Sequence, residues 1–167
     1  MTDRQELHEQ INALVARVQL LEDRQAIAQV VARYGPAADA GAADAAADLW
    51  TDDGVFDVLP AGRWVGHGEI AGMYNAEGHQ GLIMNGCGHV LTAPQISVNG
   101  NEATAWNHAL NIRYDRDVDR FWVARLSANE WHLRRVDGRW RVVNRINRNL
   151  DGSAEPREVF GRAASAR

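Results

Sequence analysis

The sequence is poor in cysteine, in excess basic charge and in long apolar runs, and each shortage excludes a class of protein. Cys87 is the single cysteine among 167 residues, so neither an internal disulfide nor a multi-cysteine metal site can form. Lysine and arginine number 18 against 22 aspartates and glutamates, without a basic block, and we therefore expect no nucleic-acid partner. No apolar run is long enough to span a membrane, and the opening MTDRQELHEQ is too polar for a signal peptide. We expect a cytoplasmic protein without membrane contact.

Motifs that bind cofactors or metals are also missing. There is no glycine-rich phosphate-binding motif and no Gly-x-Ser-x-Gly sequence. The histidines form no pair four residues apart on an expected helix, and no Cys/His cluster occurs. These absences favour a reaction that needs no cofactor and no metal, on a small and largely apolar molecule.

The first third of the chain is expected to be helical. Leu7, Ile11, Leu14, Val18 and Leu21 recur at steps of four and three within residues 4–33, the spacing of a helix that packs on another helix. The partner is either the protein's own domain or a neighbouring subunit. A second apolar face indicates a new helix near Glu22, and Gly35-Pro36 should kink or end it. We therefore divide the chain into an arm (1–21), one α+β domain (22–150) and a tail (151–167).

Shorter elements are expected before the sheet. They are a helix over 42–50, a turn at 51–54, strands at 55–58 and 63–65 around a turn at 59–62, a helix over 69–76, and a glycine-rich loop to Gly88.

The second half of the chain predicts a long antiparallel meander. The expected strands cover residues 89–98, 102–114, 120–136 and 139–148, and the dipeptides Asn99-Gly100 and Asp137-Gly138 are typical of hairpin turns. Helices followed by such a meander indicate an α+β fold, in which the N-terminal helices cover a curved antiparallel or mixed sheet and enclose a pocket. The tail after Asp151 shows little periodicity.

His89 and Asp39 are the candidate catalytic pair. The pKa of histidine, about 6.5, allows proton exchange near neutrality, and a carboxylate bonded to one ring nitrogen would leave the other free as a base. Each residue has a simpler interpretation, because His89 could be a strand histidine bonded to solvent or backbone. Asp39 could cap the next helix.

Other polar residues of the strands could assist. Arg145 is expected on one strand face with Arg141, Val143 and Asn147. If that face points inward, the guanidinium must pair or bind an anion, because an unpaired buried charge is costly. If it points outward, Arg145 is only solvated. Asn129 could offer its amide to a substrate oxygen, or occupy a bulge or edge position. The face of His108 cannot be decided. Of the remaining histidines, one is expected in a turn and two at the surface, namely His67, His79 and His132.

Several segments together resemble a known superfamily. The run EDRQAIAQVVARYGPAADAGAADAAADLWTDDGVFDV, the helix after WVGHGEI and the closing VDGRWRVVNRINR are similar to the SnoaL-like group of the nuclear-transport-factor-2-like proteins, over roughly residues 20–150. The resemblance implies a cone-shaped α+β barrel with a deep pocket. It also implies a homo-oligomer, either a trimer or a dimer, and the strand tryptophans suit an interface or a cavity wall.

Within this superfamily the sequence resembles the branch of scytalone dehydratase, bile-acid dehydratase and hexachlorocyclohexane dehydrochlorinase. Asp39 and His89 match its Asp–His dyad, and Arg145 matches an arginine near the leaving group. Ala38 and Val58 replace two tyrosines of scytalone dehydratase, which implies a different substrate. The residues implied around that substrate are Tyr34, Phe56, Val58, Trp64, His108 and Asn129.

The resemblance implies a cofactor-independent lyase, or an isomerase, that removes a proton from a small apolar substrate, with cyclic molecules among the candidates. The alternative is a non-catalytic protein of the same fold, either a small-ligand carrier or a structural subunit like the small subunit of ring-hydroxylating dioxygenases.

Overall fold

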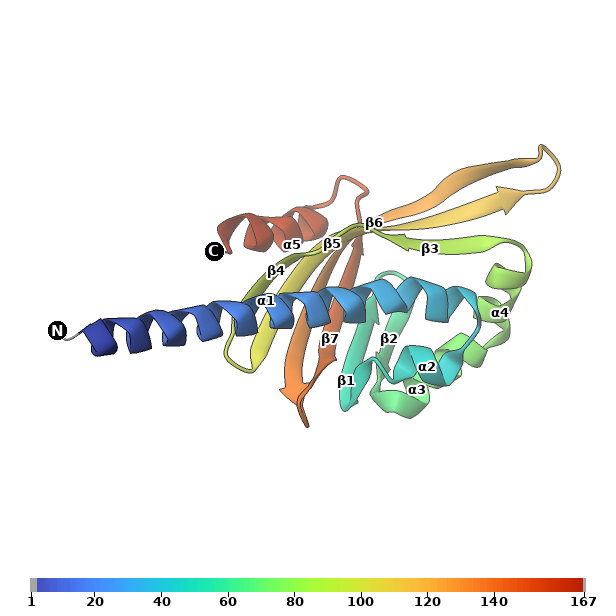
Figure 1. Ribbon diagram of the computed structural model, residues 1–167. Coiled ribbons are helices and arrows are strands. Elements are labelled where there is room, and N and C mark those ends of the chain that lie inside the picture. The colour runs from blue at the N-terminus through green and yellow to red at the C-terminus, as the bar shows by residue number, and fades with distance from the viewer. Residues whose placement is uncertain (1–2, 167) are drawn as a thin grey trace.

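The computed structural model describes residues 3–166 and shows an α+β fold built on one curved, unclosed sheet (Figure 1). The strand order is β2-β1-β7-β6-β5-β3, and β4 pairs with β5 beside this path. Helix α1 lies across one face of the sheet and α5 covers part of the other (Figure 1). The helices are α1 (Asp3–Asp39), α2 (Ala43–Ala47), α3 (Gly66–Asn75), α4 (Glu77–Met84) and α5 (Ala154–Ser165). The strands are β1 (Trp50–Val58), β2 (Gly62–Val65), β3 (Cys87–Leu91), β4 (Gln95–Asn99), β5 (Glu102–Asp115), β6 (Arg120–Val136) and β7 (Arg139–Asn149).

The meander forms as the sequence indicates, with one correction. Strands β5, β6 and β7 pair antiparallel in chain order. Gly100, in the turn between β4 and β5, and Gly138, in the turn between β6 and β7, both have positive φ. The expected strand over 89–98 is instead two strands, β3 and β4, each paired with β5. Pro94 lies in the gap between them, where it cannot donate a ladder hydrogen bond. The parallel pairing of β1 with β7 extends the sheet on its other side.

The long helix α1 corrects two expectations. It continues for 37 residues without a break at Glu22, and it passes through Gly35-Pro36 before it ends at Asp39. The apolar pattern shifts at Glu22 because the surroundings change there: residues 3–22 are exposed, whereas Asp23 and Ile27 begin the buried face. The chain leaves the helix through Gly41 in the left-handed conformation.

Three further segments differ from expectation. Residues 51–54 belong to β1, whose pairing with β7 shifts register between Trp50 and Val55, so the polar run is a strand irregularity and not a turn. The expected glycine-rich loop contains α4. The tail forms α5, because Val159 and Ala163 find a buried site against Trp106 of β5.

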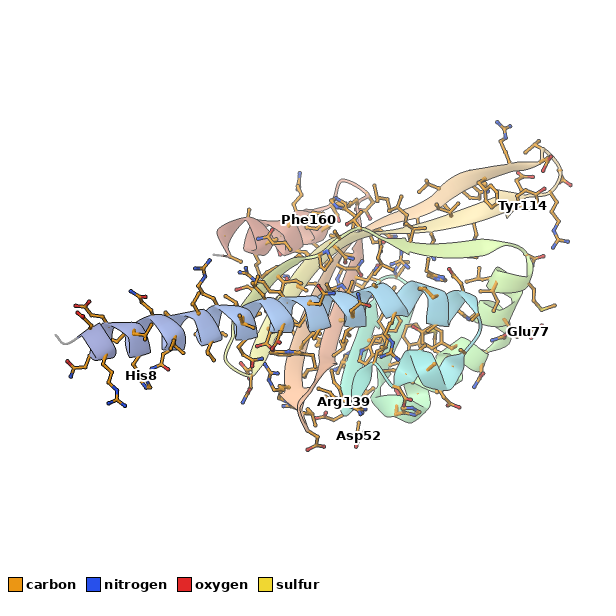
Figure 2. All side chains as sticks on the ribbon, viewed as in Figure 1. His8, Asp52, Glu77, Tyr114, Arg139 and Phe160 are labelled. Atoms are coloured by element: carbon orange, nitrogen blue, oxygen red, sulfur yellow. The ribbon has the colours of Figure 1, made fainter. Side chains whose placement is uncertain are left out.

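The main core lies between the helices and the concave face of the sheet. Trp50, Trp131 and Tyr74 are its largest fully buried apolar side chains, and Tyr34 contacts all three rings edge-on. Side chains fill this layer, whereas the start of α1, where His8 lies, and the tip of the β5–β6 hairpin, near Tyr114, project beyond it (Figure 2). No helix within residues 3–166 has the length and apolar character needed to cross a bilayer.

A buried carboxylate anchors α5 to the sheet and makes stability depend on pH. Glu130 Oε2 accepts hydrogen bonds from Arg162 Nε at 2.7 Å and Trp106 Nε1 at 2.9 Å, and Oε1 lies 2.8 Å from His132 Nε2. Burial opposes ionisation, but these three contacts outweigh it and lower the pKa of Glu130 to about 2.

Because this pKa is lower in the folded protein than in the unfolded chain, the carboxylate stabilises the fold above pH 4.5. We expect that contribution to be lost as the pH falls from 4.5 towards 2. Urea denaturation at several pH values measures the effect. Between pH 4.5 and 2 the unfolding free energy of Glu130→Gln should fall less steeply than that of the wild type. Identical pH dependence in the two proteins would contradict this assignment.

Candidate active site

Asp39 and His89 meet at the end of α1. His89 Nδ1 lies 2.6 Å from Asp39 Oδ1, and the backbone N–H of His89 donates to Oδ1 and Oδ2 at 3.0 and 2.9 Å. The His89 side chain is only 12% exposed, whereas that of Asp39 is 32% exposed. With Nδ1–H donating to the carboxylate, the neutral ring carries its lone pair on Nε2. This is the geometry that a histidine base and a carboxylate that orients it would require.

Gly35 allows α1 to come close enough for this contact. A Cβ atom at Gly35 would lie 2.3 Å from the carbonyl oxygen of His89, far inside contact distance. Asp39 follows one helical turn later, so the close approach at Gly35 brings its carboxylate onto the start of β3.

Replacing Gly35 with alanine should therefore push α1 away from β3. We expect a loss of about 1–3 kcal/mol in unfolding free energy, although alanine normally favours helix over glycine. Chemical denaturation measures the effect. The matched control is Gly72→Ala in α3, where an added Cβ meets no atom within 4 Å and stability should stay the same or rise. Equal behaviour of the two variants would show that the close approach is unimportant.

A pocket opens beside His89 on the concave face of the sheet. Its volume is about 120 Å³, several times the roughly 30 Å³ that one water occupies, so it can hold a compact organic molecule. The wall is mostly apolar and aromatic, and it includes four of the expected substrate-binding residues. They are Tyr34, Phe56, Val58 and Trp64.

Arg145 is a buried cation at this pocket. It is 2% exposed, its Nε donates to Asn129 Oδ1 at 3.1 Å, and its Nη1 has no partner among residues 3–166. Its guanidinium carbon lies 3.9 Å from the centre of the Tyr34 ring and 4.2 Å from that of Trp131, distances at which aromatic faces attract a cation. None of the ion pairs formed by the described residues includes it. The positive charge therefore remains available to a ligand.

A bulge explains why Arg145 points inward while Arg141 does not. Before Val143 the buried residues of β7 are Trp140 and Val142, and after it they are Arg145 and Asn147. The inward face therefore switches from even-numbered to odd-numbered residues at Val143. The β6–β7 register shifts at the same place. The expectation that Arg145 shares its face with Arg141 and Val143 is wrong, and only Asn147 shares it.

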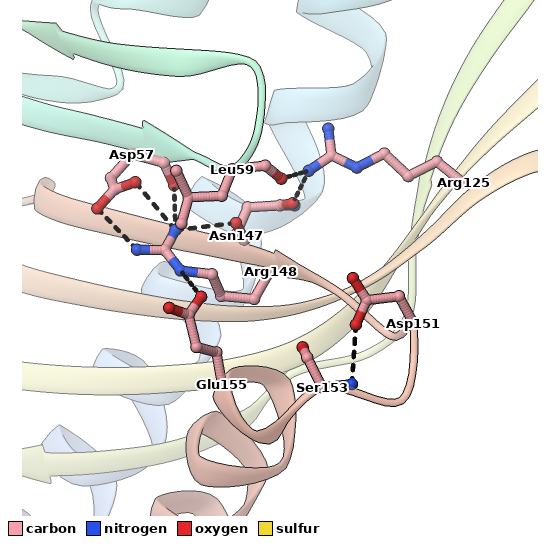
Figure 3. Close-up of polar contacts among 8 residues, drawn as sticks. All are labelled: Asp57, Leu59, Arg125, Asn147, Arg148, Asp151, Ser153 and Glu155. Atoms are coloured by element: carbon pink, nitrogen blue, oxygen red, sulfur yellow. Dashed lines mark hydrogen bonds and ion pairs between the residues drawn. The ribbon is translucent and has the colours of Figure 1, made fainter.

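A second arginine lies at the same pocket and was not expected there. Arg125 of β6 reaches the carbonyl oxygen of Leu59 at 3.2 Å and the side-chain oxygen of Asn147 (Figure 3). Burial lowers the pKa of Arg125, and the neighbouring charge of Arg145 lowers it further. The pocket lining contains both guanidinium groups and no carboxylate. Its electrostatic preference is for an anion or for a group that becomes anionic.

His79 also faces the pocket, which corrects its expected surface position. It is 8% exposed on α4, and neither ring nitrogen has a hydrogen-bond partner among residues 3–166. The ring stacks on His89 with centroids 5.8 Å apart. Burial and the neighbouring His89 lower the pKa of His79, which favours the neutral form of its ring. The nearby hydroxyl of Tyr74 is likewise buried without a partner, and burial raises its pKa well above 10.0.

The remaining candidates take supporting positions or lie elsewhere. Asn129 is fully buried and accepts bonds from Arg145 and from Asn147, so it positions the arginine and does not line the pocket. His108 was expected at the substrate, but it is exposed on the outer face, where its ring contacts Phe160 of α5 at 4.6 Å. Strand alternation puts it opposite the pocket-lining Ala109. Within residues 3–166 no group of three or more His, Cys, Asp and Glu side chains is placed to hold a metal ion.

Comparison with known proteins establishes the family. A SnoaL-like domain matches residues 19–146, and the chain belongs to this family. An NTF2-like protein with a cystatin-like fold from Novosphingobium aromaticivorans is 40% identical, over 88% of this chain and 94% of that one, with a TM-score of 0.84. No curated protein matches.

Two further solved structures share the fold. A candidate scytalone dehydratase from Novosphingobium aromaticivorans is 20% identical over 81% of this chain and 88% of its own, with a TM-score of 0.67. A protein of unknown function from Mycobacterium tuberculosis is 19% identical over 90% of both chains, with a TM-score of 0.69. The superfamily resemblance is thereby confirmed, and the family includes enzymes, scytalone dehydratase-like proteins among them.

Proposed function

We propose that this protein is a cofactor-independent lyase of the dehydratase type, or an isomerase, in which His89 removes a proton from a small substrate. The observation that carries the proposal is the 2.6 Å contact between His89 Nδ1 and Asp39 Oδ1 at the wall of a largely apolar pocket. A histidine whose tautomer is held by a carboxylate is prepared to accept a proton at its other nitrogen.

The chemistry follows from the charges around the pocket. Nε2 of His89 takes a proton from a carbon atom, the C–H electron pair moves into the substrate, and the carboxylate of Asp39 stabilises the imidazolium that forms. Arg145 then faces the developing negative charge, on an enolate oxygen or a departing group, and Arg125 adds to the same field. In an elimination the C–H pair forms the new carbon–carbon double bond, and the leaving group departs with the pair of its own bond to carbon; a hydroxyl group leaves as water after it takes the proton from the imidazolium. In an isomerisation the imidazolium returns the proton to another carbon.

The pocket also favours a substrate class. Its apolar walls suit a compact cyclic or branched molecule, and the unpartnered atoms of His79 and Tyr74 call for ligand oxygen atoms. We therefore propose a small carbonyl compound with an acidic C–H bond, and we keep the expectation of a cytoplasmic protein.

The alternative, a non-catalytic carrier or structural subunit, accounts less well for the pocket. Such a role would be favoured by a cavity filled with aromatic side chains. Instead the aromatic rings surround an open cavity, and a paired histidine and an uncompensated arginine face into it.

Proton exchange in D₂O tests the proposal for both reaction types. The purified protein is incubated with a panel of small cyclic and β-substituted carbonyl compounds, and NMR follows deuterium incorporation at carbon. The wild type should accelerate exchange or conversion of at least one compound, and His89→Asn should abolish that acceleration. Exchange that stays as fast in His89→Asn and in Asp39→Asn as in the wild type would exclude the dyad as the base.

A further inference from the structure

The N-terminal part of α1 projects from the domain with an uncovered apolar stripe. All of residues 3–22 are exposed, which corresponds to about 30 Å of helix (Figure 1). Leu7, Ile11, Leu14, Val18 and Leu21 are each 47–62% exposed. Five large apolar side chains in line on a projecting helix are unusual for a monomer, since they leave a continuous apolar surface in water.

The stripe faces away from the protein's own domain. At about 100° per residue, the five apolar residues cluster on one side of the helix axis. The residues by which the same helix packs on the sheet, among them Asp23, Ile27 and Val31, cluster roughly 160° around it. A second helix could therefore lie along the stripe while each domain remains on the outside of the pair.

We propose that residues 3–22 form a parallel two-stranded coiled coil with the same segment of a second copy of this chain. In the heptad, Ile11 and Val18 occupy position a, and Leu7, Leu14 and Leu21 occupy position d. β-Branched residues at a with leucine at d favour two parallel strands over higher oligomers. The residue types at a and d thus favour two helices, and the direction of the helices depends on the residues at e and g.

The charged residues beside the stripe match this arrangement. In a parallel pair each g residue faces the e residue five positions later on the other helix. Arg17 would face the partner's Glu22, a contact between opposite charges, and Asp3 would face the partner's His8, whose ring N–H can donate to the carboxylate. By symmetry each contact occurs twice. This interface does not depend on the reaction proposed for the pocket.

Sedimentation velocity and light scattering on the full chain test the interface. The wild type should be dimeric, and Leu14→Glu should raise the dimer dissociation constant by about 100-fold or more, because two charges enter the seam. The matched control is Ala13→Glu, which adds the same charge at the exposed position c and should leave the dimer intact. Near-ultraviolet circular dichroism should show an unchanged core in both variants, since residues 13 and 14 lie outside it.

A disulfide tests the direction of the helices. In a Cys87→Ser background, Leu7→Cys should give covalent dimers on mild oxidation, because the two positions 7 adjoin in a parallel pair. An antiparallel pair would place position 7 beside position 18 and give none.

The proposal is overturned if the wild type is monomeric at all concentrations. It is also overturned if Leu14→Glu and Ala13→Glu behave alike, or if the oligomer persists in both. Persistence would place the interface elsewhere, for example at the exposed Phe121 and Trp122 of the β5–β6 hairpin.

Discussion

Replacing His89 with glutamine is expected to lower kcat by about 10²–10⁴-fold, the usual contribution of a positioned general base. Asp39→Asn should cause a comparable loss for a different reason. The asparagine oxygen can still accept the backbone N–H of His89, but its amide group offers a donor to Nδ1. That contact favours the tautomer that carries its proton on Nε2. In this tautomer Nε2 has no free lone pair and cannot accept the substrate proton. Steady-state kinetics on the compound found by proton exchange measures both effects.

A matched control separates the site from histidine loss in general. His108→Gln removes an exposed imidazole on the outer face of the sheet, so kcat and KM should stay within about twofold of wild type, as for a surface substitution. Denaturation curves should show that all three variants are folded. Undiminished turnover in folded His89→Gln would mean that another group takes the proton.

The second large effect is expected at Arg145. Arg145→Met should lower kcat by about 10²–10³-fold, the loss typical when one group that stabilises developing negative charge is removed. Its effect on stability should be opposite to that of an ordinary buried arginine. Because the guanidinium is buried without a carboxylate, methionine should keep or increase the unfolding free energy.

Arg148 of the same strand provides the contrast. Its guanidinium pairs with Asp57 at 2.9 Å and with Glu155 at 3.2 Å, away from the pocket (Figure 3). Arg148→Met should lower stability, because it leaves the half-buried Asp57 without its partner, and should change kcat little. Thermal denaturation and steady-state kinetics on both variants test this difference: Arg145→Met should lose kcat but not stability, and Arg148→Met should lose stability but not kcat. A large stability loss in Arg145→Met with normal kcat would make Arg145 structural.

Much of the fold could be predicted from the sequence because it is encoded locally. The meander of β4 to β7 follows from alternating side chains and from glycines that accept positive φ, Gly100 between β4 and β5 and Gly138 between β6 and β7. The sequence predicts two helices where α1 is one, because periodicity records only which face is apolar, and that face changes its surroundings at Glu22 while the helix continues. Helix α5 was missed because its apolar residues are few, and their burial depends on contact with Trp106.

The site was predictable only in part. Asp39 and His89 are fifty residues apart, and the family resemblance placed them together before the geometry did. His79 lies on α4, a helix that the glycine-rich sequence does not indicate. Arg125 lies on the same face of β6 as Asn129 by strand alternation, but the sequence leaves open whether that face points inward. The bulge at Val143 reverses strand alternation, so the inward position of Arg145 could not be read from its neighbours on β7. A helix with only a structural role would bury an apolar residue at position 79. A histidine buried there indicates that α4 contributes to a ligand pocket.

The central claim is that Asp39 holds the imidazole of His89 with its proton on Nδ1 and a free Nε2 toward the pocket. Nitrogen-15 NMR of histidine-labelled protein near pH 8 measures this directly and needs no substrate, and the His89→Gln spectrum identifies the signal. The wild type should show a protonated Nδ1 and an unprotonated Nε2 at His89, and Asp39→Asn should shift the population towards the other tautomer. A proton on Nε2 in the wild type, or a spectrum unchanged by Asp39→Asn, would contradict the claim.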